Sequence, residues 1–373
     1  MPGLAVIATP RPYSMRRSQA LEDAVSDLDW SGDGSLIVAG SAAGILHRFS
    51  CDGDPLGSWQ GHEGGVTRVC FKPGDDAALA SAGEDGRVRL WDTHSGSQTA
   101  TLAEEQTWVE HLAWTPDGKV LAAAARKTIS LWQGNEPLGV WYDARRQVLA
   151  MAWAPDGNRL ATAANKGLYL WRMNNTAATS EPMQLLGFPG APIALAWQPN
   201  GRALAVGTQD GFLQVWRPAG INSGAAKKTA SQLTMRGYTG KVACLAWHPS
   251  EALIATAGGP DVVLWELPGN SGGAKGRPLR HHQATITALA WSVDGLRLAS
   301  GDRAGRLCIW DTDGKAIFSQ VIGQEISAIR WHPTQSVLTI GDTAGGLYFF
   351  DHIHPDRDST TKSPDQEADI EQR

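Results

Sequence analysis

Serine, histidine and aspartate occur together at positions that could support nucleophilic catalysis. His62, Ser81 and Asp85 lie close in the sequence, and Trp91 follows them. In a hydrolase such a trio activates the serine hydroxyl through a histidine that the acid orients. The string GNSGG at 269–273 also matches the G-x-S-x-G pattern of a nucleophile elbow. That pattern carries a nucleophile only on a sharp strand-to-helix turn, whereas here it lies in the polar stretch LPGNSGGAKGRP, which is typical of a loop.

Two histidine pairs, His281–His282 and His352 with His354, could ligate a metal ion. Neither pair has cysteines nearby or a helical spacing, and two ligands do not make a site. We therefore interpret them as surface pairs and expect neither a metal nor a cofactor. The cysteines show no C-x-x-C spacing and are expected to be reduced packing residues; they are Cys51, Cys70, Cys244 and Cys308.

These residues belong to a segment pattern that repeats along the chain. Eight aromatic anchors, 39 to 50 residues apart, each precede a turn such as TPDG or APDG; they are Trp30, Phe71, Trp114, Trp153, Trp197, Trp247, Trp291 and Trp331. A second aromatic residue follows each anchor by 18 to 20 residues. Proline, aspartate and glycine suit these turns, and β-branched residues before the anchors suit strands. Four short strands per repeat are typical of a β-propeller blade.

The second repeat contains GHEGG at 61–65 and LWD at 90–92. On these motifs the chain resembles the WD-repeat β-propeller family from about Ser14 to Asp351, with degenerate repeats of a bacterial type. The resemblance implies that the four residues at 62, 81, 85 and 91 form a structural hydrogen-bond network inside one blade. In the seventh repeat His282, Ser300 and Trp310 remain, but Ala304 stands where the acid belongs. No catalytic residue is therefore expected.

The repeat count predicts a single all-β propeller of eight four-stranded blades, with seven blades as the alternative because seven is the commonest number in the family. Eight three-stranded cores leave only seven bridging strands. We expect RRSQALEDA, before Trp30, to supply the eighth by pairing with residues 346–350, which closes the ring and removes the sheet edge. The predicted domains are an extension at 1–13, the propeller at 14–355 and a disordered polar tail at 356–373.

Charge and hydropathy limit the classes of partner. The net charge is −5 and the pI is near 6.1, without the basic stripe that nucleic-acid binding usually needs. No apolar run is as long as a membrane span, and the first residues lack the order of a secretory signal. We expect a cytoplasmic protein, monomeric on its own, that binds neither nucleic acid nor membrane.

One tryptophan lies outside the repeat. Of sixteen tryptophans, thirteen occupy the two repeat positions, Trp59 and Trp141 share a third, and Trp108 has no counterpart. Trp108 lies in EEQTWVEH, in a turn expected on the face around the central channel. Turns expected on the same face carry Arg126, Lys127, Arg145, Arg146 and Lys166. An exposed tryptophan among arginines is typical of an interface hot spot; burial of Trp108 over its own blade is the alternative.

These features favour a non-catalytic scaffold that binds another protein through the channel-facing surface. The alternative is a cofactor- or metal-binding propeller, either a quinoprotein-like enzyme or an adaptor for a metal-handling partner. Two longer loops, 218–231 and 267–280, could instead form a basic patch for an acidic partner; they carry Lys227, Lys228, Lys275, Arg277 and Arg280.

Overall fold

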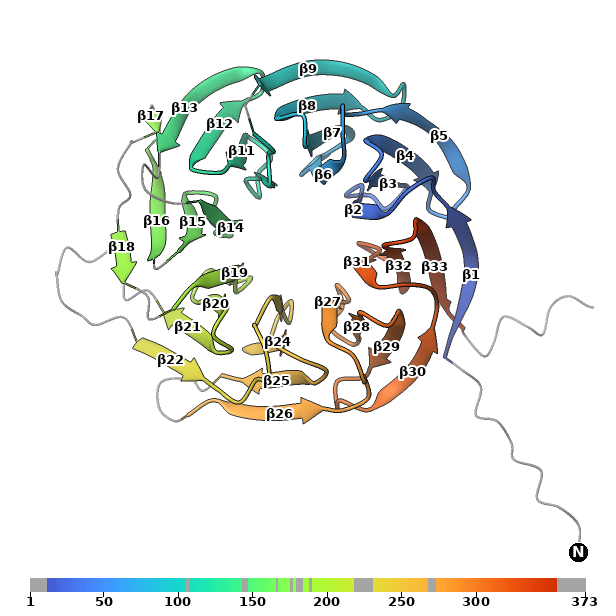
Figure 1. Cartoon of the computed structure of the whole chain (residues 1–373), viewed down its shortest axis with the longest axis vertical. Helices are drawn as coiled ribbons and strands as arrows, with labels where there is room; N and C mark the ends of the chain where they lie inside the picture. Colours follow the sequence, from blue (N-terminus) through green and yellow to red (C-terminus); the bar gives the residue numbers. More distant parts are fainter. Residues whose placement is uncertain are drawn as a thin grey trace, which may run out of the picture.

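Each repeat forms one small antiparallel sheet, and the sheets are arranged as blades in a closed ring (Figure 1). The structure is a computed structural model that describes residues 12–104, 107–142, 147–165, 167–174, 177–178, 184–187, 190–217, 231–267 and 273–353. There are eight blades, so the predicted eight-bladed propeller is confirmed and the seven-bladed alternative is wrong. The described residues form strands and turns without a helix, and thus include no helix able to span a membrane.

Within each blade the strands follow one another outward from the ring axis in chain order, except that the N-terminal strand is the outermost strand of blade 8 (Figure 1). Blade 1 consists of β2 (Val25–Trp30), β3 (Leu36–Ser41), β4 (Ile45–Ser50) and β5 (Pro55–Gln60). Blade 2 consists of β6 (Val66–Lys72), β7 (Asp75–Gly83), β8 (Arg87–Asp92) and β9 (Ser97–Glu104). Blade 3 consists of β10 (His111–Trp114), β11 (Val120–Ala125), β12 (Thr128–Gln133) and β13 (Glu136–Tyr142). Blade 4 consists of β14 (Val148–Trp153), β15 (Arg159–Ala164) and β16 (Gly167–Asn174), with β17 (Ala177–Ala178) and β18 (Gln184–Gly187) both paired to β16.

The second half of the ring repeats this order. Blade 5 consists of β19 (Pro192–Trp197), β20 (Leu204–Thr208), β21 (Leu213–Arg217) and β22 (Ser231–Met235). Blade 6 consists of β23 (Cys244–Trp247), β24 (Leu253–Ala257), β25 (Val262–Glu266) and β26 (Lys275–Leu279). Blade 7 consists of β27 (Ile286–Trp291), β28 (Leu298–Asp302), β29 (Arg306–Trp310) and β30 (Ala316–Val321). Blade 8 consists of β31 (Ile326–Trp331), β32 (Val337–Asp342), β33 (Gly346–His352) and the N-terminal strand β1 (Tyr13–Ala20).

The N-terminal strand closes the ring, as the sequence predicts. β1 pairs antiparallel with β33, from Tyr13 opposite His352 to Ala20 opposite Gly346 (Figure 1). The strand begins three residues before the predicted segment and ends at Ala20, so Leu21 to Ala24 lie outside it. Tyr13 is 1% exposed and packs between Phe318 of blade 7 and Trp331. The predicted domain boundaries remain predictions, and the tail at 356–373 lies outside the described residues.

Tryptophan anchors join neighbouring blades. Five of them donate their indole N–H to a main-chain carbonyl of the preceding blade at 2.9–3.2 Å; these are Trp153, Trp197, Trp247, Trp291 and Trp331. The hydrophobic clusters extend across these junctions; one, for example, joins Leu28 and Trp30 of blade 1 to Val337 and Phe349 of blade 8. Burying one indole removes about 150–250 Å² from water. Packing between blades therefore accounts for the repeated tryptophans.

Two histidines add a further contact between blades. His332 and His248 each follow an anchor tryptophan, and each Nε2 lies 3.0 Å from the carbonyl of a glycine in the next blade, Gly34 and Gly295 respectively. A Cβ atom on Gly34 would lie 2.2 Å from the His332 ring, so this turn requires glycine for the close approach. The recurring string WHP, at 247–249 and 331–333, is the sequence signal for this contact.

Candidate functional site

Ser81, His62 and Asp85 of blade 2 lie in the geometry of a hydrolytic triad. His62 Nε2 is 2.7 Å from Ser81 Oγ, and His62 Nδ1 is 2.8 Å from Asp85 Oδ1. The indole N–H of Trp91 donates to Ser81 Oγ at 2.8 Å. Asp85 is ionised and can only accept, so the proton of the neutral His62 ring lies on Nδ1, which donates to Asp85. Nε2 then accepts the hydroxyl hydrogen of Ser81, whose oxygen accepts the indole N–H.

The environment of this network suits a structural role. Ser81 is 0% exposed, and its hydroxyl oxygen already accepts from Trp91. Burial lowers the pKa of His62, which keeps the ring neutral. Burial alone would raise the pKa of Asp85, but hydrogen bonds from His62 and Arg89 hold it at about 2. The arrangement therefore fixes the register of the blade through satisfied buried polar groups, and offers no open position for a substrate.

Blade 7 contains the same network with its acid at another position. His282 lies 2.7 Å from Ser300 Oγ and 2.8 Å from Asp302 Oδ2, and Trp310 donates to Ser300 at 2.8 Å. The interpretation of Ala304 as a missing acid is thus wrong. Asp302 opposes Ile286 at the end of β28, the register position that Gly83 holds opposite Val66 in blade 2. The string GD at 301–302, repeated at 341–342, is the signal that could have identified it.

The candidate metal ligands that the structure describes contact other side chains. His282 is part of the blade 7 network, and His281 faces the Trp310 ring at 6.1 Å. His352 packs edge-on against Tyr13, while His354 lies outside the described residues. No group of three or more metal-ligating side chains occurs in the part of the chain that the structure describes. The four cysteines are free thiols, and burial raises the pKa of Cys244 and of Cys308 to about 12.

Trp108 lies in the turn between β9 and β10 and is 55% exposed. Its neighbour Val109 is buried and donates its amide to the Gly83 carbonyl at 3.2 Å, which ties this turn to blade 2. The turn between β11 and β12, with exposed Arg126 and Lys127, lies on the same face because successive strands in a blade are antiparallel. We call the exposed side chains of Trp108, Arg126 and Lys127 the upper patch.

Arg126 holds an unusual backbone conformation. Its φ is +52°, and it is the only non-glycine residue with positive φ among the described residues. Glycine adopts this region without strain, whereas a residue with a Cβ atom does so at a cost. The Arg126 carbonyl accepts the amide of Val148, which links the turn to blade 4. An exposed arginine thus stands where glycine would fit the backbone better.

Other predicted contact residues fall partly outside the described chain. The residues outside the described part of the chain are Arg145, Arg146, Lys166, Lys227 and Lys228. The GNSGG string also lies outside it, except for Gly273. Within the described part, Lys275 is exposed on β26. Arg277 donates to the Thr312 carbonyl of blade 7 at 3.2 Å, and Arg280 pairs with Asp261 at 3.3 Å. Two of the residues expected to form a basic patch are therefore already engaged within the propeller.

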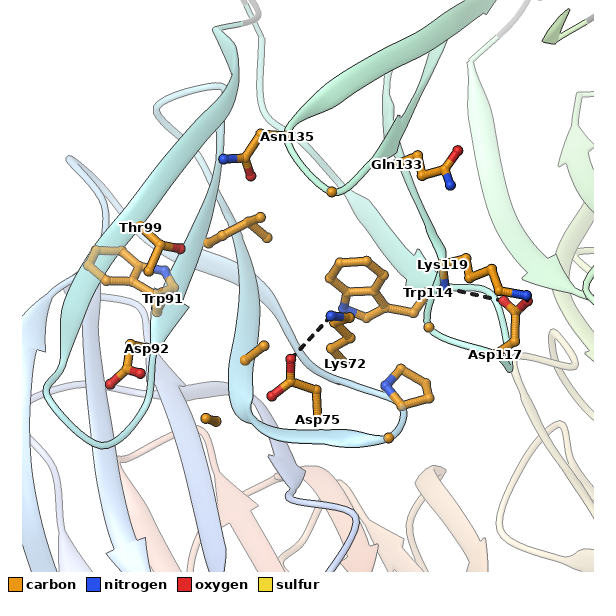
Figure 2. A pocket seen from close by; sticks show the side chains of 17 residues that line it. Lys72, Asp75, Trp91, Asp92, Thr99, Trp114, Asp117, Lys119, Gln133 and Asn135 are labelled. Atoms are coloured by element: carbon orange, nitrogen blue, oxygen red, sulfur yellow. Dashed lines mark hydrogen bonds and ion pairs between the residues drawn. The ribbon is translucent and has the colours of Figure 1, made fainter. Parts of the chain in front are cut away.

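A groove of about 780 Å³ opens between blades 2 and 3 (Figure 2). It lies on the face opposite the upper patch, because its lining includes the turn between β6 and β7, at the other ends of the strands. Blade 2 contributes Lys72, Asp75 and Asp92, and blade 3 contributes Trp114 and Asn135. Figure 2 shows the Trp114 indole between the two walls, with Lys72 paired to Asp75 at 3.1 Å. The sequence reasoning missed this groove.

The fold is a β-propeller, and two of its blades, 2 and 7, contain a buried histidine–serine–tryptophan network. The WD40 model (WD domain, G-beta repeat) matches residues 16–47, 53–92, 96–133, 135–172 and 183–217. The chain belongs to the WD-repeat β-propellers. The first β-propeller of IFT140 is a further matching model, over residues 231–326.

Several named proteins are similar to parts of this chain. Telomerase protein component 1 of Mus musculus is 25% identical over 293 residues, covering 75% of this chain and 11% of that protein. Nuclear distribution protein nudF of Aspergillus niger is 22% identical and covers 72% of this chain and 54% of its own length. Eukaryotic translation initiation factor 3 subunit I of Phaeosphaeria nodorum is 30% identical over 106 residues, covering 28% of this chain and 31% of its own.

These comparisons concern the share of each relative that the chain covers, the type of repeat and the fold. The chain spans about a tenth of the length of the telomerase component and about half of nudF. The three relatives come from eukaryotes, so a bacterial type of repeat is not supported. Among solved structures, the computationally designed Ika8 protein aligns with a TM-score of 0.73 at 21% identity, over 89% of this chain and 98% of that protein. That likeness concerns the fold alone.

Proposed function

We propose that this propeller is a non-catalytic scaffold that binds a protein partner through its upper patch. The observation that carries the proposal is the 55% exposure of Trp108, a tryptophan outside every repeat position. Tryptophan and arginine are the residues most enriched at interface hot spots. The strained, exposed Arg126 in the neighbouring blade supports the same surface, since strain at an exposed residue favours a functional role. Arg145, Arg146 and Lys166 belong to this proposal as sequence predictions.

The buried triads support the absence of catalysis. A nucleophilic serine must reach its substrate, whereas Ser81 and Ser300 are both 0% exposed and hydrogen-bonded to tryptophan. The structural hydrogen-bond networks account for these two serines, so no catalytic activity is needed to explain them. The alternative of a quinoprotein-like enzyme draws its support from the eight blades with their tryptophans. The alternative of an adaptor for a metal-handling partner draws its support from the two histidine pairs, whose described members contact other side chains.

The relatives favour a role in larger assemblies. Their names include a component of telomerase and a subunit of an initiation factor, and we infer a comparable role in a protein complex for this chain. Free thiols at all four cysteines favour a reducing compartment, which supports a cytoplasmic location. We also propose that the chain is monomeric on its own and binds neither nucleic acid nor membrane.

A comparative pull-down tests the upper patch. The intact protein and a Trp108→Ala/Arg126→Glu variant serve as baits in extract of the source cells, with captured proteins identified by mass spectrometry. The matched control is Leu296→Ala, which removes a residue of similar exposure (53%) from the opposite face. We expect a partner that the double variant loses and the control retains. A partner retained equally by all three proteins, each shown to be folded, would contradict the proposal.

A further inference from the structure

The junction between blades 2 and 3 differs from the other junctions of the ring. Seven of the eight anchor aromatics are at most 9% exposed, and Trp114 is the one that is only partly buried. The indole N–H of Trp114, like that of Trp30, has no acceptor among the described residues, whereas the five anchors from Trp153 to Trp331 donate to the preceding blade. One face of this indole therefore borders the groove of about 780 Å³ (Figure 2).

Small side chains of blade 2 line the uncovered side of the indole. In blades 3 and 4, the residue before the strand partner of the anchor lies against the tryptophan anchor of the next blade. In blade 2 this residue is Ala78, preceding Leu79, and Ala77 lies beside it. Val120 holds the same register position in blade 3 and packs in one cluster with Trp153. Ala78 leaves the Trp114 indole uncovered, whereas at Ala203, the alanine of this position in blade 5, the next tryptophan is 8% exposed and shares a cluster with Leu267.

Blade 4 shows what fits this space. There the equivalent residue is Arg159, which precedes Leu160, and its guanidinium lies 4.9 Å from the centre of the Trp197 ring. Asp156, in the turn of the same blade, holds the guanidinium from the side at 2.8 Å. Arginine over an indole is a favourable cation–π arrangement, strengthened here by a carboxylate. The fold thus places an arginine on an anchor tryptophan within this same chain.

The groove has carboxylates suited to the same chemistry. Its walls carry three acids, Asp75, Asp92 and Asp117, against the two cations Lys72 and Lys119. The two lysines pair with Asp75 and Asp117, and these pairs are exposed, so they contribute little and can be exchanged. Asp92 accepts from Ser95 and forms no ion pair with a residue that the structure describes. The surplus charge of the walls is negative.

We propose that the groove between blades 2 and 3 binds an arginine side chain from a basic segment of a partner protein. The guanidinium lies on the open face of Trp114, as Arg159 lies on Trp197, with Asp75 and Asp92 as the facing carboxylates. Arginine is favoured over lysine because its planar group both stacks on an indole and pairs with a carboxylate. The groove volume lies within the usual range for ligand sites, about 300–1,000 Å³. This is a second binding surface, on the face opposite the upper patch.

The indole N–H resonance of Trp114 reports directly on this site. The protein, labelled with ¹⁵N at its tryptophan indoles and assigned through Trp114→Phe, is titrated with the peptide acetyl-Gly-Arg-Gly-Arg-Gly-amide. Matched peptides carry lysine or the uncharged citrulline in place of arginine. We expect a saturable shift of the Trp114 signal with the arginine peptide, and binding about threefold weaker with lysine and about tenfold weaker with citrulline. An unmoved Trp114 signal, or equal binding of the three peptides, would overturn the proposal.

Two variants test the geometry independently. Ala78→Arg places in cis the arginine that blade 4 carries at this position, and we expect it to weaken binding of the arginine peptide about tenfold while the protein stays folded. Asp92→Asn retains the turn acceptor, removes the charge, and should weaken binding about threefold. Asp311→Asn, at the equivalent position of blade 7, is the matched control and should leave binding unchanged. Binding that neither Ala78→Arg nor Asp92→Asn reduces would overturn the assignment.

These measurements are independent of the scaffold proposal. They use a peptide of known composition and residues on the face opposite Trp108. Loss of the arginine site would leave the upper patch untouched, and a negative pull-down with the Trp108 variant would not affect the peptide titration.

Discussion

The chemistry of Ser81 is set by its neighbours. The same three residue types that hydrolyse esters elsewhere are here combined with a tryptophan that donates to the serine oxygen. Removal of the hydroxyl leaves a buried indole N–H and a buried imidazole without their partner, and each unpaired buried group costs about 1–3 kcal/mol. The network therefore acts on the stability of blade 2.

Ser81→Ala is expected to lower the free energy of unfolding by about 2–4 kcal/mol. The equivalent Ser300→Ala should have a similar effect, because its histidine and tryptophan hold the same distances. Urea unfolding followed by far-ultraviolet circular dichroism measures both. Ser58→Ala, at an exposed position of β5, is the control and should change stability by less than about 0.5 kcal/mol. An equal effect of Ser58→Ala and Ser81→Ala would refute the structural role.

His111 predicts a dependence of stability on pH. Burial, with a contribution from Arg68, lowers the pKa of His111 from 6.5 to about 4, and its ring Nε2 lies 3.3 Å from the Val148 carbonyl. The unfolded chain takes up this proton near pH 6.5 and the folded chain only near pH 4. The folded state is therefore increasingly disfavoured as the pH falls between these values. His111→Gln should flatten this decline by up to about 3 kcal/mol.

The comparison of variant and parent isolates His111 from other groups. Burial lowers the pKa of His62, His282 and His332 too, so the variant keeps part of the decline. Asp29 acts in the opposite direction, since burial raises its pKa to about 6. Denaturant unfolding of both proteins at pH 4, 5, 6 and 7 gives the difference. A difference in stability that is constant across this range would contradict the assignment.

At the scale of the element, β1 determines whether the ring is closed. It covers the outer edge of β33 and carries Tyr13 into the contact with blade 7. Without it, β33 would present an unpaired edge, and such edges favour association. At the junction of blades 8 and 1, the Ser327 hydroxyl donates to the Val25 carbonyl at 2.6 Å, so a hydrogen bond joins the last blade to the first.

Deletion of residues 1–20 is therefore expected to lower the melting temperature and to produce oligomers. Deletion of residues 1–11 alone, which leaves β1 intact, is the matched control and should melt like the full chain. Calorimetry and size-exclusion chromatography with light scattering measure the two properties. A 1–20 deletion that melts like the control as a monomer would show that β1 does not contribute to closure.

The repeat allowed most of the architecture to be predicted, because each blade repeats the same anchors in the same register. Local departures from the repeat were not predictable. Asp302 was not predicted as the acid of the network, because its carboxylate reaches His282 from the end of a strand and not from a turn. The groove at Trp114 lies where Ala77 and Ala78 of one repeat meet Trp114 of the next, a long-range contact that neither repeat shows alone. The exposure of Trp108, by contrast, agrees with its lack of a counterpart.

At the scale of the whole molecule, the ring offers two faces with different chemistry. The upper patch presents an exposed indole and basic side chains, and the opposite face presents the acidic groove at Trp114. A rigid ring can hold two partners in a fixed relation when each binds its own face. The buried polar groups stabilise the ring, and we propose that Trp108 and Trp114, the two tryptophans that depart from the repeat, contact other proteins.

Site-specific photo-crosslinking tests the central claim most directly. p-Benzoylphenylalanine replaces Trp108 in one sample and the similarly exposed Leu296 in another, and each protein is irradiated in extract of the source cells. The account predicts a discrete crosslinked partner from position 108 that is absent from position 296 and is reduced by excess unlabelled parent protein. Crosslinks that are identical at the two positions, or absent at position 108, would contradict a scaffold acting through the upper patch.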